Sequence, residues 1–125
     1  AAFEPGSHGS TFGGNPLACA VASAALDVIM DEKLVENSAV MGAYLKERLL
    51  KLQTDKIQEV RGQGLMVAIQ LTHDAGAASV YTRKLLELGV LAKGTHEHTI
   101  RFAPPLIITK KNIDWAMERI EQVFR

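Results

Sequence analysis

The stretch IQEVRGQGLMVAIQL, Ile57 to Leu71, contains two short runs that are typical of β-strands. We expect one strand over residues 57–61 and a second over residues 65–71. The segment between them, Gly62-Gln63-Gly64, has two glycines, which allow a sharp bend or a bulge. The stretch therefore predicts two neighbouring strands joined by a tight connection.

The residues before and after these strands show mainly helical patterns. An amphipathic helix is expected over residues 34–53, because apolar side chains recur at helical spacing there. The expected elements after residue 71 are, in order, a helix over 75–88 that ends at Gly89, strands over 90–92 and 99–102 with a polar loop (93–98) between them, and a last helix capped by Thr109. From Ile57 onward, the order β-β-α-β-β-α predicts a small sheet covered by two helices, an α+β layer.

The N-terminal part of the chain predicts a different substructure. Asn15 and Pro16 are typical of a helix start, with Asn as the N-cap and Pro at the first helical position. The helix is expected over residues 17–30, and in its first part, up to residue 26, only Ser23 is polar. A helix that is apolar on nearly all sides is normally buried. We therefore expect two substructures: a leading helical part that belongs to a larger core, and a compact C-terminal α/β lobe.

Composition and charge argue against several classes of protein. The chain has 125 residues, of which 47% are hydrophobic and 22% charged, and its formal net charge is zero. This balance gives no electrostatic surface suited to nucleic acid or to an anionic membrane. The apolar run over residues 16–30 is shorter than the ~20 residues that a membrane span needs. No signal peptide is recognisable, and the single cysteine fits a reducing compartment, so we expect a soluble, cytoplasmic protein.

The loop over residues 6–15 is a candidate anion-binding site. It contains four glycines and the hydroxyl side chains of Ser7, Ser10 and Thr11, and it leads into a helix N-terminus. Glycines let backbone N–H groups approach a ligand, and the helix end favours negative charge. The loop matches neither a Walker A motif nor a dinucleotide fingerprint. Two interpretations stay open: a phosphate-holding loop, or a tight surface turn that feeds a helix.

Arg101 is a second candidate binding residue. It lies in HTIRFAPPL, residues 98–106, where its strand neighbours Ile100 and Phe102 should point to the opposite face of the sheet. A planar guanidinium suits a carboxylate in a bidentate contact. On the residues alone, Arg101 could bind a carboxylate ligand or form a structural ion pair with an acidic side chain.

Other reactive residue types give weaker indications. His96 and His98 would lie on one face of a strand, but no third metal ligand is evident, so we expect no metal site. Cys19 lies in the apolar helix and is expected to be a small buried hydrophobe. The eight lysines lie in helices, near helix ends or in polar loops, where nothing would lower a pKa for covalent chemistry. The residues therefore predict an anion-holding loop and a carboxylate clamp, without a nucleophile.

Three segments of the chain carry a family resemblance: GSHGSTFGGNPLACAVA (residues 6–22), EVRGQGLMVAIQL (59–71) and GVLAKGTHEHTIRFAPPLIIT (89–109). Together they resemble the C-terminal part of class III, pyridoxal-phosphate-dependent aminotransferases. The resemblance covers essentially the whole chain in order. Within the class, the third segment is most similar to ornithine aminotransferases, whereas acetylornithine aminotransferases share the first two segments.

The resemblance implies a domain assignment and roles for three residues. Residues 1–33 would form the C-terminal edge of the large cofactor-binding domain of a fold-type I enzyme, and residues 34–125 its C-terminal small α/β domain. Ser10 and Thr11 would contact the phosphate of pyridoxal 5′-phosphate in the partner's active site, across a homodimer. Arg101 would bind a carboxylate of the amino-acid or 2-oxo-acid substrate.

The resemblance also implies what the chain lacks. In this family the Schiff-base lysine, the aspartate that pairs with the pyridinium nitrogen and the aromatic residue that stacks on the ring all lie upstream, so no catalytic residue is expected in these 125 residues. The chain alone would be inactive, as a segment of an enzyme that moves the terminal amino group of ornithine to 2-oxoglutarate. Acetylornithine or another class III substrate is the alternative. A free-standing anion-binding α/β module is a further alternative, although it would have to expose its apolar helix.

Overall fold

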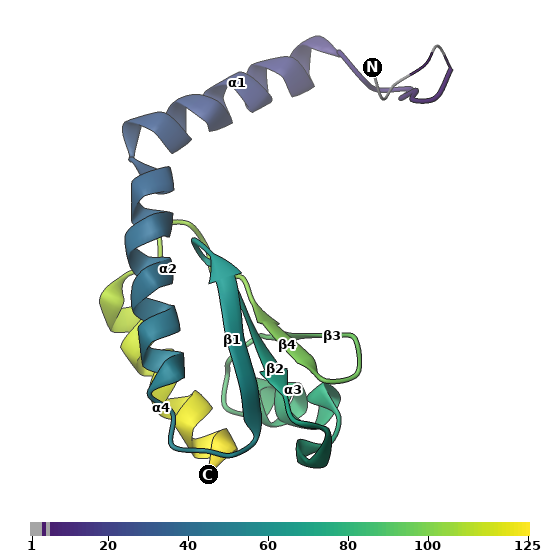
Figure 1. Ribbon diagram of the computed structural model, residues 1–125. Helices are drawn as coiled ribbons and strands as arrows, with labels where there is room; N and C mark the ends of the chain where they lie inside the picture. Colours follow the sequence, from purple (N-terminus) through teal and green to yellow (C-terminus); the bar gives the residue numbers. More distant parts are fainter. Residues whose placement is uncertain (1–3, 5) are drawn as a thin grey trace. The chain divides into compact units, whose positions relative to one another are not determined.

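The computed structural model describes residue 4 and residues 6–125, and the chain divides into two compact units (Figure 1). The first unit extends through Lys33, and the second is Leu34–Arg125. Residues 1–3 and residue 5, which belong to the segment 1–33 assigned above to a large domain, lie outside the described residues.

The first unit consists of the glycine-rich loop and helix α1 (Pro16–Asp31). The predicted helix start is confirmed: the side chain of Asn15 accepts a hydrogen bond from the backbone N–H of Ala18 at 2.9 Å, and Pro16 opens the helix. Every residue of α1 is exposed except Ile29, which is half-buried. Within the described residues of the first unit, nothing covers this apolar helix.

The second unit contains an antiparallel sheet of four strands in the order β1-β2-β4-β3, all within the fully described residues 34–125. Strands β1 (Ile57–Gln63) and β2 (Met66–Leu71) form the predicted hairpin. Their connection is tighter than expected, because Gln63 pairs with Met66 and only Gly64 and Leu65 lie in the turn. Gly64 has a φ of 51°, a conformation that glycine adopts without strain.

One predicted strand is misplaced. Residues 90–92 are not in a strand, and β3 is Lys93–Thr95, inside the segment expected to be a polar loop. The reason lies in the end of the preceding helix: the backbone N–H of Val90 donates to the carbonyl of Leu85 at 2.8 Å and so closes the helix terminus. The side chain of Val90 is buried, but its backbone is not available for the sheet. Pairing with β4 (Thr99–Phe102), which lies as predicted, begins only at Lys93.

Three helices cover one face of the sheet. They are α2 (Leu34–Leu50), α3 (Ala78–Glu87) and α4 (Lys110–Phe124), and α2 and α4 run side by side in Figure 1. The order of elements after Ile57 predicts two covering helices, which are α3 and α4. Helix α2, at the start of this unit, is a third covering helix. The fully buried core side chains come from the three helices and from strands β2 and β4, and they include Leu49, Val67, Ile69, Leu71, Leu85, Ile100, Ile113, Met117 and Ile120. Each such side chain contributes about 1.5–3 kcal/mol on burial, so this unit has a hydrophobic core of its own.

Two helix boundaries differ from the prediction for local reasons. Helix α2 ends at Leu50 instead of residue 53, because the N–H groups of Lys51 and Leu52 bond three residues back and tighten the last turn. Helix α3 begins at Ala78 instead of residue 75. A short 3₁₀ turn, His73–Ala75, occupies the start of the expected range, and Gly76, with a φ of 83°, separates it from α3.

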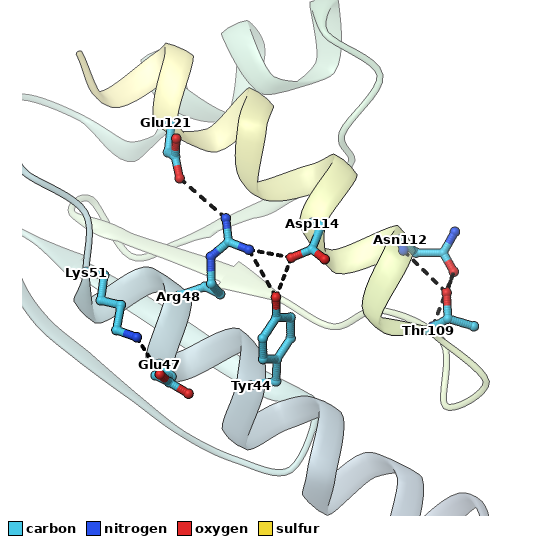
Figure 2. A network of polar contacts seen from close by, with 8 residues as sticks. All are labelled: Tyr44, Glu47, Arg48, Lys51, Thr109, Asn112, Asp114 and Glu121. Atoms are coloured by element: carbon cyan, nitrogen blue, oxygen red, sulfur yellow. Dashed lines mark hydrogen bonds and ion pairs between the residues drawn. The ribbon is translucent and has the colours of Figure 1, made fainter.

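Hydrogen bonds and ion pairs connect α2 and α4 within the helix layer (Figure 2). The guanidinium of Arg48 donates to Asp114 and to the hydroxyl of Tyr44, and its other nitrogen lies 3.6 Å from Glu121. The hydrogen bond with Tyr44 and the carboxylates of Asp114 and Glu121 raise the pKa of Arg48. The network is half-exposed, so it orients the two helices more than it stabilises them.

Among the described helices, none is long and apolar enough to cross a membrane.

Candidate functional site

The loop before α1 leaves its polar groups open. Ser10 and Thr11 are exposed. In the turn that follows, the backbone N–H groups of Gly13 and Asn15 donate to the carbonyls of Ser10 and Phe12, each at 3.3 Å. In the described part of the chain, the hydroxyls of Ser10 and Thr11 and the backbone N–H groups of Gly9, Ser10 and Thr11 have no hydrogen-bond partner. Hydroxyl and backbone N–H donors next to a helix N-terminus are the donor set that a phosphate requires. These residues therefore fit the phosphate group expected for this loop.

Strand β4 presents Arg101 to the face of the sheet that the helices do not cover. Its neighbours Ile100 and Phe102 are buried in the core, as the alternation of the strand predicts, and Arg101 itself is half-buried. No carboxylate within the described residues forms an ion pair with Arg101. The structural ion pair, the alternative interpretation of this residue, is thus not formed in the part of the chain that is described. The guanidinium is available for an anion from outside.

The pairing of the strands places Arg101 in a row of four residues that crosses the sheet. Arg61 of β1 is paired with Ala68 of β2, Ala68 with Arg101 of β4, and Arg101 with Lys93 of β3. Side chains at paired positions of an antiparallel sheet lie on the same face. Three cationic side chains therefore cross the open face, interrupted only by the small methyl group of Ala68.

A shallow hollow lies over this row. Its volume is about 590 Å³, and its walls include Arg61, Ala68, Thr95, His96 and Arg101. The small side chain of Ala68 leaves room between the two arginines. The volume of the hollow falls within the range of small-molecule sites, and the guanidinium of Arg101 lies at its wall.

Hydrogen bonds on the same face hold the neighbouring side chains in place. Arg61 donates to Glu59 at 2.8 Å and to Gln70 at 3.4 Å, and Thr99 donates to Gln70 at 2.7 Å. The charge of Arg61 is thus paired within the sheet, in contrast to that of Arg101. Sequence reasoning assigned no role to Arg61 and placed Lys93 in a loop. Only the register of β3 on β4 brings Lys93 next to Arg101.

His96 lines the hollow, whereas His73, His98 and Cys19 do not. His98 contacts the carbonyl of Gly76 through Nδ1 at 3.1 Å, and its ring meets that of His73 edge to face. In the described residues, no three side chains of metal-ligating type come together. Cys19 is exposed on α1, so the expectation that it is buried is wrong for this chain, because no described residue of the first unit covers α1.

Comparison with known families decides what these features belong to. The family model for class-III aminotransferases matches residues 1–124. The chain belongs to the class-III aminotransferase family. This class-III chain is 60% identical over 121 residues to the ornithine aminotransferase of Brevibacillus brevis, and 54% identical over 123 residues to that of Bacillus subtilis. These alignments cover 97% and 98% of the chain but 30% of each relative, so the chain spans about a third of the length of the curated relatives it matches.

Solved aminotransferases have the same fold in the matching region. The chain superimposes on the ornithine aminotransferase of Toxoplasma gondii with a TM-score of 0.86 at 44% identity, over 97% of this chain and 29% of that one. The acetylornithine aminotransferase of Elizabethkingia anophelis gives a TM-score of 0.85 at 46% identity, over 98% of this chain and 33% of that one. The small sheet with its helices is therefore part of a larger aminotransferase fold, as the sequence predicts. The Toxoplasma structure contains pyridoxal phosphate at partial occupancy in its active site.

Proposed function

We propose that this chain is the C-terminal segment of an ornithine aminotransferase, which moves the terminal amino group of ornithine to 2-oxoglutarate. Curated ornithine aminotransferases at 52–60% identity over nearly the whole chain support this assignment. The structural observation that carries it is Arg101, a guanidinium on the open sheet face without a carboxylate partner among the described residues. Such a group suits the carboxylate that every amino-acid and 2-oxo-acid substrate has.

In this proposal the first unit binds the cofactor and the second unit binds the substrate. Ser10, Thr11 and the neighbouring backbone N–H groups would bind the phosphate of pyridoxal 5′-phosphate, since their donors are open. When it is bound, the cofactor supplies the electron sink on which amino transfer depends. Arg101 would bind the substrate carboxylate and so orient the substrate's amino or oxo group toward the cofactor. The complete enzyme would be a cytoplasmic homodimer, in which the loop completes the partner's site.

The donor specificity of the enzyme that contains this chain tests the proposal. We expect kcat/KM with 2-oxoglutarate as acceptor to be higher for ornithine than for N-acetylornithine. The reverse preference would favour an acetylornithine aminotransferase, a candidate supported by the solved structure at 46% identity. If neither donor reacts and the protein has no cofactor absorbance, the anion-binding module becomes the better assignment.

The proposal also includes the inactivity of this chain on its own. The residues that would attach the cofactor covalently lie outside it, so none of its eight lysines should react specifically. Incubation of the 125-residue chain with pyridoxal phosphate, followed by borohydride reduction and mass spectrometry, should give no stoichiometric label. Complete labelling of a single lysine would contradict this part of the proposal.

A further inference from the structure

The position opposite Arg101 on the neighbouring strand carries a second cation. Lys93 of β3 is the register partner of Arg101, and both side chains point to the open face. Paired side chains on an antiparallel sheet have Cβ atoms about 4.5–5.5 Å apart, and like charges in such a pair destabilise the sheet. An adjacent ammonium and guanidinium therefore favour the arrival of an anion that neutralises them.

The other charges of this face do not compensate Lys93. Glu59, a carboxylate of the same sheet, is already bonded to Arg61 at 2.8 Å. Within the described chain, Lys93 has no ion pair or hydrogen bond of its side chain. A separate depression of about 220 Å³, lined by Leu91, Lys93 and Arg101 among others, joins the two cations. The positive charge of the row is thus concentrated at Arg101 and Lys93.

We propose that Lys93 is a specificity-determining residue that favours the acceptor over the donor at the Arg101 site. This inference rests on the proposed function. The acceptor, 2-oxoglutarate, has two carboxylates and a net charge of −2, whereas ornithine has two ammonium groups, one carboxylate and a net charge of +1. The ammonium of Lys93 attracts the first molecule and repels the second, while Arg101 binds a carboxylate of either. A single lysine therefore shifts the two Michaelis constants in opposite directions.

A purely structural role of Lys93 makes a different prediction. Lysine on an edge strand such as β3 also prevents the strand from pairing with other molecules. Loss of that function would lower the solubility or stability of the enzyme, and it would change the Michaelis constants for both substrates in the same direction. The opposite response of the two substrates is therefore the informative measurement.

The test uses the full-length enzyme that contains this chain, with Lys93→Met as the main variant. We expect KM for 2-oxoglutarate to rise about threefold to tenfold, which is the effect of removing one unit charge a few ångströms from the ligand in a solvated site. KM for ornithine should fall by about twofold, and kcat should change little. The rise should shrink at high salt, because exposed charges are screened. Lys93→Arg should restore both constants.

Two further variants separate the possible outcomes. Lys84→Met removes the same charge from α3, on the helix-covered face, and should leave both Michaelis constants unchanged. Arg101→Met should raise KM for both substrates, because both lose their carboxylate partner. If Lys93→Met changes neither constant, or raises both equally, the inference is wrong while the Arg101 site stands. If Arg101→Met has no effect on either, the proposed function itself fails. Should Lys93→Met express poorly, Lys93→Gln gives the same charge change with a polar side chain.

Discussion

Helices α1 and α4 are similar in length and in the chemistry of their starts, yet they differ in burial. Helix α1 has 16 residues and an asparagine cap, and none of its residues is buried. Helix α4 has 15 residues and a Thr109–Asn112 capping box, and five of its residues are buried in the core. Local sequence therefore sets where both helices begin. Burial depends on packing partners, which α4 has within residues 34–125 and α1 lacks among the described residues of its own unit.

The matched region is 30% of the length of each curated relative, and the proposed assignment places α1 in the large domain of such an enzyme. We therefore expect the second unit to behave as an independent folding unit, and the first to reach its stable state only in the complete enzyme.

The largest expected effect comes from truncating matched apolar side chains in the two units. Ile69 is completely buried, and Leu26 is 63% exposed. In urea unfolding of the 125-residue chain, Ile69→Ala should lower the free energy of unfolding by about 3–4 kcal/mol, whereas Leu26→Ala should lower it by less than about 0.5 kcal/mol. Equal losses would show that α1 is packed in the isolated chain and would contradict the comparison.

Two glycines extend the comparison to close backbone contacts. A Cβ atom added to Gly42 of α2 would lie 1.9 Å from the carbonyl oxygen of Gly64, whereas one added to Gly9 in the loop would meet nothing within 4 Å. Gly42→Ala should therefore destabilise the second unit by about 2–3 kcal/mol, because backbone must move. Gly9→Ala is the control and should leave the melting temperature unchanged. An unchanged melting temperature for Gly42→Ala would mean that α2 does not pack against the hairpin turn as described.

The two caps offer a smaller and more specific test. Thr109→Ala and Asn15→Ala each remove a side-chain acceptor for a helix N–H group, worth about 1 kcal/mol. Thr109→Ala should lower the melting temperature of the second unit, since α4 is part of its core. Asn15→Ala should reduce helical circular dichroism without moving that transition. A shift of the same transition by Asn15→Ala would indicate that the two units unfold together.

The smallest effect concerns stability at alkaline pH. Tyr81 is buried, its hydroxyl donates to the carbonyl of Ala75 at 2.9 Å, and its ring stacks on Phe124. Burial, with a smaller contribution from Asp55, raises the pKa of Tyr81 above its usual value. The unfolded chain therefore loses this proton first, and stability should fall as the pH rises above about 10.

Tyr81→Phe removes this titration and supplies the control. The variant should lose about 1 kcal/mol at neutral pH with the hydrogen bond, and its stability should decline less steeply than that of the wild type above pH 10. Identical alkaline slopes, measured by urea unfolding at a series of pH values, would mean that Tyr81 is accessible to solvent.

Much of the fold could be predicted because local signals are strong. Asn15-Pro16 and Thr109 mark the two helix starts, and the alternation around Arg101 predicted which of its neighbours are buried. The prediction of a strand over residues 90–92 was wrong. The side chain of Val90 is buried in the core, but its backbone N–H bonds to Leu85 at the end of α3 and not to a neighbouring strand. Periodicity reports the side chain's environment and carries no information about that hydrogen bond.

The candidate site could be predicted only residue by residue. Single residues such as Arg101, Ser10 and Thr11 stand out through residue type and family resemblance. The row across the sheet could not be predicted, because it depends on strand order and register. Arg61 is distant from Arg101 in the sequence and enters the row because β1 pairs with β2. Lys93 enters it because β3 pairs with β4.

The central claim is that the loop binds the cofactor phosphate and the sheet binds the substrate carboxylate. The most direct test measures the dissociation constant of pyridoxal phosphate and KM for 2-oxoglutarate in the full-length enzyme, for Ser10→Ala/Thr11→Val and for Arg101→Met. We predict that the loop variant weakens cofactor binding about tenfold or more with little change in KM. Arg101→Met should raise KM about a hundredfold with unchanged cofactor affinity. Unchanged cofactor binding in the loop variant, or an unchanged KM in Arg101→Met, would contradict the account.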